Sequence, residues 1–417
     1  MDLFCRRAIP AFASLVIALP CLAADANWPQ WRGPRGDGHS AEAGVPIQWD
    51  ARSVVWKAPL KGRGQSSPVI WGNRIFLTTA LDNGKQRLVF CLDRKDGKLL
   101  WERVAWRGTP EKSHEMNGWA TPTCATDGER VFAFFGRGGL HAFTVDGKPL
   151  WSRDLGRFEG PWGTSASPIL AGDLVIQNCD AEKEAYLLAV DKRTGKTVWK
   201  TPRDVPERGG WSTPVLVPVS GRQELVLNGA RAVTGYDPVT GKVLWSCRSF
   251  NGRGEPTATP GRGLVFMVNG LPGDLYAVRP GGSGDVTRSH MAWHTPRRGG
   301  RDQPSPIVVD NYLVVADMGG ITTCYEADSG KELWKERLNS RFLSSPIAAG
   351  GRVYFQNEAG VTYVIEPGAK KKLVSQNNLD APTDETFRAS LTPSGGQVFA
   401  RSDRALYCID ARPPRGK

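Results

Sequence analysis

After its first 24 residues, the chain repeats one pattern, in which short apolar runs alternate with short polar turns. Arg74–Leu77 and Arg352–Phe355 are typical runs, each placing β-branched or aromatic residues after a glycine-containing turn. This pattern predicts short β-strands. The 48 Gly and 30 Pro among 417 residues are too many turn formers for a helical bundle. With 40% hydrophobic residues and 15 Trp the chain can fill a core, so we predict an all-β globular fold.

One repeated phrase consists of an acidic residue, a turn with Gly-Lys, an aliphatic residue and a Trp. It occurs at 93–101, 191–199, 237–245 and 328–334, with a shortened copy at 146–151. The glycine suits a tight hairpin that needs a positive φ. We expect the Trp to open an outer strand and to bury its ring against the neighbouring repeat. The predicted docking residues are Trp56, Trp101, Trp151, Trp199, Trp245, Trp293 and Trp334.

A second phrase, two small residues and Pro before an apolar strand, occurs eight times. Its prolines are separated by 54, 46, 46, 46, 46, 40 and 47 residues; they are Pro68, Pro122, Pro168, Pro214, Pro260, Pro306, Pro346 and Pro393. A period near 45 residues with several short strands per unit is typical of β-propeller blades. The sequence therefore predicts eight blades.

The two ends of the repeat array complement each other. The eighth unit ends after 405–410 without an outer strand, and a spare strand at 53–56 precedes the first unit. Joining them leaves no unpaired sheet edge at the ring closure. We predict an eight-bladed propeller over 53–417, closed by an N-terminal strand that completes the last blade, with 25–52 as an extension. Leu373-Val374 replace the Trp of the seventh outer strand, so we expect a weaker contact there.

The repeated Asp-x-x-x-Gly-Lys-x-x-Trp phrase resembles the tryptophan-docked propellers of the PQQ-repeat proteins. These include quinoprotein dehydrogenases and the BamB-type scaffolds of outer-membrane assembly. The segment 27–34 (Asn-Trp-Pro-Gln-Trp-Arg-Gly-Pro) also resembles the start of exported PQQ-binding-like propellers of planctomycete-type bacteria. The resemblance covers nearly all of the chain after residue 24. It is specific for the fold, because the repeated residues are those that hold blades together.

Residues 1–24 have the layout of a secretory signal peptide. Arg6 and Arg7 precede an apolar run at 8–19, and Ala23 and Ala24 follow. The run is too short for a permanent span, and no later stretch approaches the roughly 20 apolar residues that a transmembrane helix needs. Pro20 before Cys21 disfavours lipid attachment. We predict export to the periplasm or cell envelope.

The net charge has implications for the binding partners, and the cysteines have implications for the core. The formal charge of +12 favours acidic partners, but export makes nucleic acid the poorest of them, and we expect most of this charge to be scattered over the surface. Cys91, Cys324 and Cys408 share a strand context that predicts buried core positions, while disulfides of Cys124 and the cysteines at 179 and 247 stay open. We expect a monomer that binds an envelope or outer-membrane protein.

Segments just before each Pro copy are expected to reach the mouth of the central channel, where a propeller can bind ligands. Aromatic and cationic groups there can stack on and neutralise a small anionic ligand. In the alternative interpretation the tryptophans cap the core and the Arg and Glu residues pair with each other. The candidates are Gln65, Trp119, Trp162, Trp211, Glu255, Arg301, Asp302, Gln303, Arg341 and Arg388.

Two function classes remain. The first is a non-enzymatic, BamB-like binding or scaffold propeller; the second is a PQQ-dependent alcohol or sugar dehydrogenase. For the second, the resemblance implies a stacking Trp, a calcium ion with about six to eight oxygen ligands, an adjacent disulfide and a catalytic Asp. The chain has no adjacent Cys pair, and Glu255 and Asp302 lack an obvious amide partner. We therefore predict no catalytic residue and no metal site, and keep PQQ with calcium as the alternative cofactor.

Overall fold

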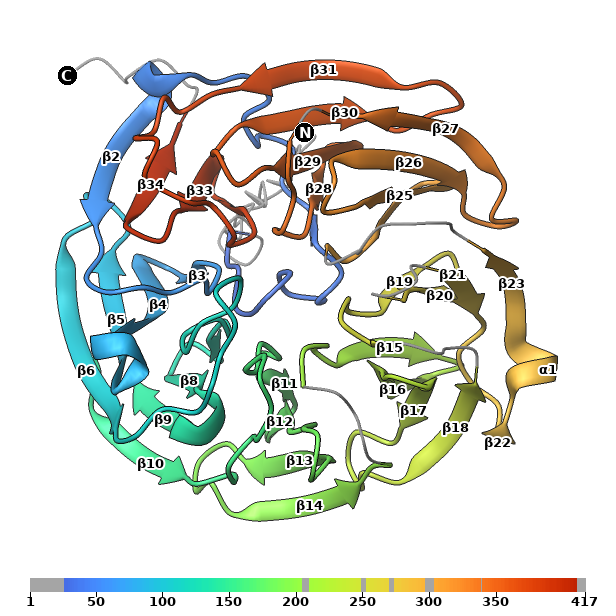
Figure 1. The fold of residues 1–417 in the computed structure, drawn as a ribbon, viewed down its shortest axis with the longest axis horizontal. Helices are drawn as coiled ribbons and strands as arrows, with labels where there is room; N and C mark the ends of the chain where they lie inside the picture. The colour runs from blue at the N-terminus through green and yellow to red at the C-terminus, as the bar shows by residue number, and fades with distance from the viewer. Residues whose placement is uncertain are drawn as a thin grey trace, which may run out of the picture.

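The computed structural model describes residues 26–204, 210–248, 253–269, 274–296, 304–338 and 340–410. Its strands form eight sheets of four or five strands. Figure 1 shows these sheets arranged as blades around a central axis, with the N-terminal segment, in blue, crossing the middle of the ring. The predicted all-β, eight-bladed propeller is confirmed.

The first four blades follow the chain order from the innermost strand outward. Blade 1 contains β3 (Val69–Trp71), β4 (Arg74–Leu81), β5 (Gln86–Asp93) and β6 (Leu99–Arg107); blade 2 contains β7 (Ala125–Thr126), β8 (Arg130–Phe134), β9 (Leu140–Thr144) and β10 (Pro149–Arg153); blade 3 contains β11 (Ile169–Ala171), β12 (Leu174–Asn178), β13 (Tyr186–Asp191) and β14 (Thr197–Pro202); blade 4 contains β15 (Val215–Val219), β16 (Arg222–Asn228), β17 (Ala232–Tyr236), β18 (Val243–Arg248) and, outside them, β22 (Gly284–Asp285).

The other four blades continue in the same sense around the ring. Blade 5 contains β19 (Thr259–Gly261), β20 (Leu264–Val268), β21 (Leu275–Val278) and β23 (Met291–Thr295); blade 6 contains β24 (Ile307–Val309), β25 (Tyr312–Ala316), β26 (Ile321–Glu326) and β27 (Glu332–Arg337); blade 7 contains β28 (Ile347–Ala349), β29 (Arg352–Gln356), β30 (Thr362–Glu366), β31 (Lys372–Asn377) and, inside them, β1 (His39–Ser40); blade 8 contains β32 (Thr392–Ser394), β33 (Gln397–Arg401), β34 (Ala405–Ile409) and β2 (Val54–Pro59). Short helical turns are η1 (Ala51–Ser53), η2 (Asp82–Gly84), η3 (Gly136–Gly138) and α1 (Thr287–His290).

The ring closes where the sequence predicts. Strand β2 pairs antiparallel with β34, with Trp56 opposite Cys408 and Ala58 opposite Leu406. In Figure 1 the N-terminal β2 lies beside the C-terminal β34 at one position of the ring. The hydrophobic core lies between blades; for example, Phe76 of blade 1 belongs to the same buried cluster as Phe143 of blade 2. Each blade is therefore stabilised by its neighbours.

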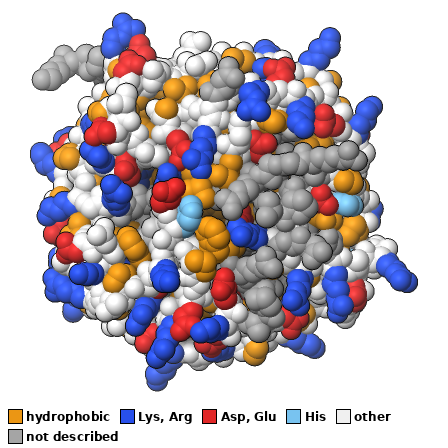
Figure 2. Space-filling view, in the orientation of Figure 1, with side chains coloured by type: hydrophobic (Ala, Val, Ile, Leu, Met, Phe, Trp, Pro, Cys, Tyr) orange, Lys and Arg blue, Asp and Glu red, His pale blue; other side chains and the backbone are white. Residues whose placement is uncertain are grey.

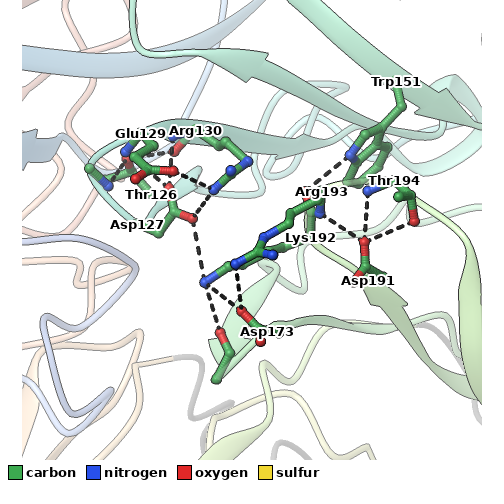
Figure 3. Close-up of polar contacts among 12 residues, drawn as sticks. Thr126, Asp127, Glu129, Arg130, Trp151, Asp173, Asp191, Lys192, Arg193 and Thr194 are labelled. Atoms are coloured by element: carbon green, nitrogen blue, oxygen red, sulfur yellow. Dashed lines mark hydrogen bonds and ion pairs between the residues drawn. The ribbon is translucent and has the colours of Figure 1, made fainter.

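The acidic turns form the docking points between blades. Figure 3 shows one of them, where Trp151 of blade 2 donates to the carbonyl of Lys192 in the blade 3 turn at 3.1 Å. Asp191 accepts hydrogen bonds from the backbone and hydroxyl of Thr194 and so fixes this turn. The same indole-to-carbonyl bond of 2.9–3.2 Å joins Trp56, Trp101, Trp199, Trp293 and Trp334 to the next blade.

Trp245 differs from the other docking tryptophans. Its indole donates to Glu224 of its own blade at 2.7 Å, and both side chains are fully buried. The turn that would receive it is replaced by a longer connection, which adds β22 in parallel to β18 and donates the Gly281 amide to Glu224. Because this insertion occupies the docking place, the Trp is retained inside blade 4.

The N-terminal extension supplies the aromatic ring that the seventh outer strand lacks. Trp49 is buried and stacks on Tyr354 of blade 7, with ring centroids 6.3 Å apart and planes inclined by 8°. Its backbone amide donates to Asn377 at 3.0 Å, and the Asn377 amide donates to the carbonyl of Ile47 at 3.0 Å. The blade 7–8 junction is thus filled by a segment from the other end of the chain.

Candidate functional site

A closed ring of hydroxyl groups lines the propeller axis. In every blade, a buried Ser or Thr lies two residues before the innermost strand, and its backbone amide donates to the hydroxyl of the corresponding residue in the next blade. The eight bonds measure 2.8–3.2 Å and return to their starting point. We call these residues the hydroxyl belt: Ser67, Thr123, Ser167, Thr213, Thr257, Ser305, Ser345 and Ser390.

The belt residue lies at the same distance from the innermost strand in every blade, whereas the distance between the belt residue and the Pro varies. In five blades the belt residue directly precedes the Pro of the repeated phrase, as at Ser167-Pro168. In blade 2 it follows Pro122, and in blades 5 and 8 it lies three residues before the Pro. The repeat was defined on its prolines, which is why the belt was not predicted. The recurring hydroxyl at a fixed distance from the inner strand is the signal that could have found it.

The N-terminal residues 26–40, which we call the plug, close one end of the channel. Trp28 forms a bridge with Ile70 of blade 1, and β1 pairs with β28 of blade 7. Arg32 is fully buried in the plug and donates to the carbonyls of Asp37 and Pro306, each at 2.8 Å, and to Thr259 at 3.2 Å. Burial lowers the pKa of Arg32 to about 10, against the opposing effect of Asp37. The plug is therefore anchored on several blades.

A second segment, residues 108–119, crosses the other end of the channel; we call it the strap. Arg87 of blade 1 pairs with Glu111 at its start. Its middle part accepts a hydrogen bond from Arg388 at the carbonyl of Glu115, at 2.8 Å, and Asn117 donates to the carbonyl of Trp162 at 2.9 Å. The strap thus connects blade 1 with the loops that lead into blades 3 and 8.

Between plug and strap lies a cavity of about 170 Å³. Trp31 of the plug lines it from one side, and His114, Met116 and Asn117 of the strap line it from the other. Seven of the eight belt residues form its wall, while Thr257 faces a second cavity beyond the plug. The cavity is therefore polar, aromatic at its ends, and bounded by two segments that do not belong to the repeats.

The structure brings five of the predicted rim residues to this cavity, namely Gln65, Trp162, Trp211, Glu255 and Arg388. Trp119 is not part of the lining; its indole donates to the carbonyl of Glu111 at 2.8 Å and its ring packs near Gly84. Arg341 lies at the mouth, 3.4 Å from Glu358 and 2.9 Å from the sulfur of Met116. Arg301, Asp302 and Gln303 lie outside the described residues.

Arg253 is a charged cavity residue that the sequence did not predict. Its guanidinium lies 4.9 Å from the ring centroid of Trp162 and 5.9 Å from that of Trp211. Glu255, the one carboxylate among the described lining residues, is 3.7 Å from it. A cation within about 6 Å of an aromatic ring face is attracted to it, so both rings help to hold the guanidinium.

The described part of the cavity does not fit PQQ with calcium. Calcium binds about six to eight oxygen ligands, many of them carboxylates. No group of three or more His, Cys, Asp or Glu side chains that could hold a metal ion occurs in the described ranges. All six cysteines in the described chain are buried in blade cores, and burial raises the pKa of the Cys91, Cys124 and Cys324 thiols to about 12.

The outer surface carries mixed charge. On the face seen in Figure 2, Lys and Arg side chains are spread around the periphery and interspersed with Asp and Glu, without gathering in one patch. Many of them form exposed ion pairs, such as Arg262 with Asp328 at 2.7 Å. Among the described residues, no helix has the length and hydrophobicity to cross a membrane.

Sequence comparisons place the chain in a known family. The sequence model of the family described as "Outer membrane protein assembly factor BamB" matches residues 41–178, 183–277 and 272–412. The outer membrane protein assembly factor BamB of Shewanella oneidensis is 25% identical over 304 residues, which cover 70% of this chain and 69% of the relative. The tetrathionate hydrolase of Acidithiobacillus ferrooxidans is 22% identical over 351 residues, covering 73% of this chain and 65% of that enzyme.

Solved structures show the same fold. BamB from Moraxella catarrhalis superposes with a TM-score of 0.63 at 16% identity, covering 87% of this chain and 99% of that one. A europium-containing methanol dehydrogenase superposes with a TM-score of 0.65 at 12% identity, covering 93% of this chain and 98% of that one. At these identities the structural likeness establishes the fold alone. With its sequence model matched over most of its length, the chain belongs to the outer membrane protein assembly factor BamB family of PQQ-repeat propellers.

Proposed function

We propose that this protein is a non-enzymatic, exported propeller of the cell envelope that binds an envelope or outer-membrane protein as a scaffold. The names of its BamB relatives point to outer-membrane assembly as the setting. The alternative, a PQQ-dependent alcohol or sugar dehydrogenase, is supported only by a shared fold.

The observation that carries the proposal is the double closure of the channel. An enzyme of the quinoprotein type needs an open, cofactor-sized cavity, and ligand pockets usually measure about 300–1,000 Å³. Here the plug and the strap lie across the two ends of the channel and leave about 170 Å³ between them, and the second cavity of about 550 Å³, beyond the plug, offers a calcium ion one carboxylate, Asp37, among its described lining residues. What the chain offers to a large partner is a rigid ring with apolar side chains on its outer strands, including Val55, Leu150 and Val198. We propose that these side chains, which lie on three different blades, contact the partner.

Site-specific photo-crosslinking tests the scaffold. A crosslinking residue placed at Val55, Leu150 or Val198 in cells should form adducts with an outer-membrane assembly protein, identified by mass spectrometry. The buried Val175 of blade 3, at which a crosslinker cannot reach a partner, serves as the matched control. Adducts restricted to soluble enzymes, together with a PQQ chromophore and dye reduction after reconstitution with PQQ and calcium, would instead establish the dehydrogenase.

We also propose that the channel takes up a small anionic ligand. The two guanidinium groups of Arg253 and Arg388 line the same cavity with one described carboxylate. This binding is compatible with the scaffold function, because the cavity lies inside the ring and leaves its outer surface free.

A further inference from the structure

The guanidinium of Arg253 donates no hydrogen bond to a described residue, although a buried cation requires acceptors. Its side chain is 16% exposed, and its Nε is buried without a partner among the described residues. The nearest carboxylate oxygen, on Glu255, is 3.7 Å away, beyond hydrogen-bond distance. No other described residue accepts a hydrogen bond from its five N–H groups. Leaving a buried polar group unsatisfied is costly, and more so for a charged group. The arrangement therefore calls for an external acceptor in the cavity.

The indole rings fix where this acceptor must lie. The guanidinium of Arg253 lies over the rings of Trp162 and Trp211. Its N–H groups point outward from the edge of the guanidinium plane, so an acceptor must approach that edge. Trp162 is itself held by His114, whose ring lies 5.0 Å away, and by the bond that Asn117 donates to its carbonyl. The Arg253 side chain is thus pre-organised in one orientation, which reduces the entropy lost on binding.

The hydroxyl belt supplies further donors. Each belt oxygen accepts an amide hydrogen from the neighbouring blade, as Ser167 does from Thr123 at 2.9 Å. Other hydroxyl groups near the axis donate to carbonyls, as Thr392 does to Pro68 at 2.7 Å and Thr259 to Pro306 at 2.8 Å. The belt hydroxyls make no such bond to a described residue, so their protons remain available to a bound group.

The charged side chains of the described lining favour a negatively charged ligand. Arg253 and Arg388 line the cavity, and the Arg388 charge is shared with Glu358 at 2.7 Å, outside the lining. Glu255 lies beside Arg253 but accepts none of its hydrogen bonds. The described lining thus carries two guanidinium groups and one carboxylate. A group that offers several acceptor oxygens and negative charge complements this lining, because charge-assisted hydrogen bonds to Arg are the strong ones.

We infer that the central cavity is a binding site for a small oxyanion, held by the Arg253 guanidinium between Trp162 and Trp211 and by belt hydroxyls. The inference rests on the proposed binding role of the channel and names its ligand class. The volume of about 170 Å³ suits phosphate, sulfate or a short dicarboxylate and is too small for a large cofactor. Both the inorganic and the organic anions present the same fork of oxygens to a guanidinium.

Calorimetric titration of the full chain tests the site. Phosphate, sulfate and succinate are titrated separately at fixed ionic strength, with chloride as the reference anion. At least one oxyanion should bind with millimolar or better affinity, and the one that binds identifies the ligand as inorganic or organic. Arg253→Met should weaken binding about tenfold or more, the effect expected when a charge-assisted bidentate contact is lost. Absence of binding by all three probes overturns the inference.

Matched variants keep the result interpretable. Arg341→Met removes a guanidinium at the mouth that does not line the cavity, so affinity should stay within about twofold of the parent protein. Arg253→Lys retains the charge but not the fork and should bind more weakly than the parent. Equal affinity of the parent, R253M and R253K proteins would overturn the site even if all three fold. Because crosslinking at the outer strands does not depend on Arg253, a parent protein that binds none of the three anions but still forms the adducts would contradict this inference without contradicting the scaffold function.

Discussion

At the scale of single residues, the blade junctions depend on a glycine and an indole that fit each other. Gly195 has a φ of 70°, which a hairpin glycine was predicted to adopt. The structure adds a second reason for glycine: a Cβ at this position would lie 2.7 Å from the ring of Trp151. Gly241 shows the same relation to Trp199 at 2.5 Å. The repeated Gly and the repeated Trp are thus two halves of one contact between neighbouring blades.

We expect Gly195→Ala to be more destabilising than Gly172→Ala in the same blade. Gly172 has a φ of 61°, but a Cβ added there would meet no atom within 4 Å, so its substitution should cost only the left-handed strain of about 1–2 kcal/mol. Gly195→Ala adds an overpacking cost of about 1–3 kcal/mol against Trp151. Urea unfolding of both variants measures the difference. Equal losses of unfolding free energy would show that the indole moves aside without cost.

At the scale of elements, the segments outside the repeats could not be placed from the sequence. The repeats predicted each blade, because strands and turns recur with local signals. The plug and the strap have no repeat, and their positions depend on contacts with remote residues, such as Arg32 with Pro306 and Arg388 with Glu115. Arg253 was missed for a related reason, since the prediction took rim residues from the segments just before each Pro, and Arg253 lies seven residues before Pro260.

Trp49→Ala tests whether the N-terminal extension replaces the missing seventh docking Trp. Trp49 is 6% exposed and stacks on Tyr354, so its truncation should cost about 3–5 kcal/mol, as for other buried aromatic residues. Trp71→Ala, at a position that is 36% exposed, serves as the control and should cost less. Thermal unfolding of the two variants provides the measurement. A loss at Trp49 no larger than at Trp71 would mean that blades 7 and 8 hold together without the extension.

The closure strand should make the protein sensitive to acid. Burial alone would raise the pKa of Glu385, but hydrogen bonds from Lys57 of β2 and from Ser402 and Tyr407, at 2.6–2.7 Å, outweigh it and hold this pKa below its ordinary value. A carboxyl whose pKa is lower in the folded than in the unfolded state contributes stability above the unfolded pKa of about 4.3. That contribution is lost as the pH falls through the folded pKa.

Glu385→Gln should therefore flatten the decline of unfolding free energy below about pH 4.3, while lowering stability at pH 7 by about 1.5–3 kcal/mol. Asp384→Asn, which breaks only the exposed pair with Arg404, is the control and should leave the pH profile unchanged. Denaturant titrations from acidic to neutral pH compare the three proteins. A decline of the same steepness in E385Q and the parent protein would assign the acid sensitivity to other carboxyl groups.

At the scale of the whole molecule, the ring is closed twice, by β2 on β34 and by the hydroxyl belt around the axis. The first closure was predicted, because counting repeats shows that the eighth unit lacks an outer strand and that a spare strand precedes the first unit. The second was not, because a ring of amide-to-hydroxyl bonds becomes visible only when all eight inner strands are placed. The prediction of the channel rim was limited in the same way. It found residues next to the starts of the inner strands, but not the plug and the strap that cover them.

Two truncations separate the contributions of the plug and the closure strand. A chain starting at residue 51 loses the plug and Trp49 but keeps β2, so we expect a ring with a lower melting temperature that still unfolds in one transition. A chain starting at residue 60 also loses β2 and leaves β34 with an unpaired edge, a known site of aggregation. For this chain we expect an earlier, separate transition of blade 8 in scanning calorimetry and oligomers in size-exclusion chromatography. If both chains unfold alike, the belt and the interblade core are sufficient to hold the ring together, and the pairing of the two termini adds little to its cooperativity.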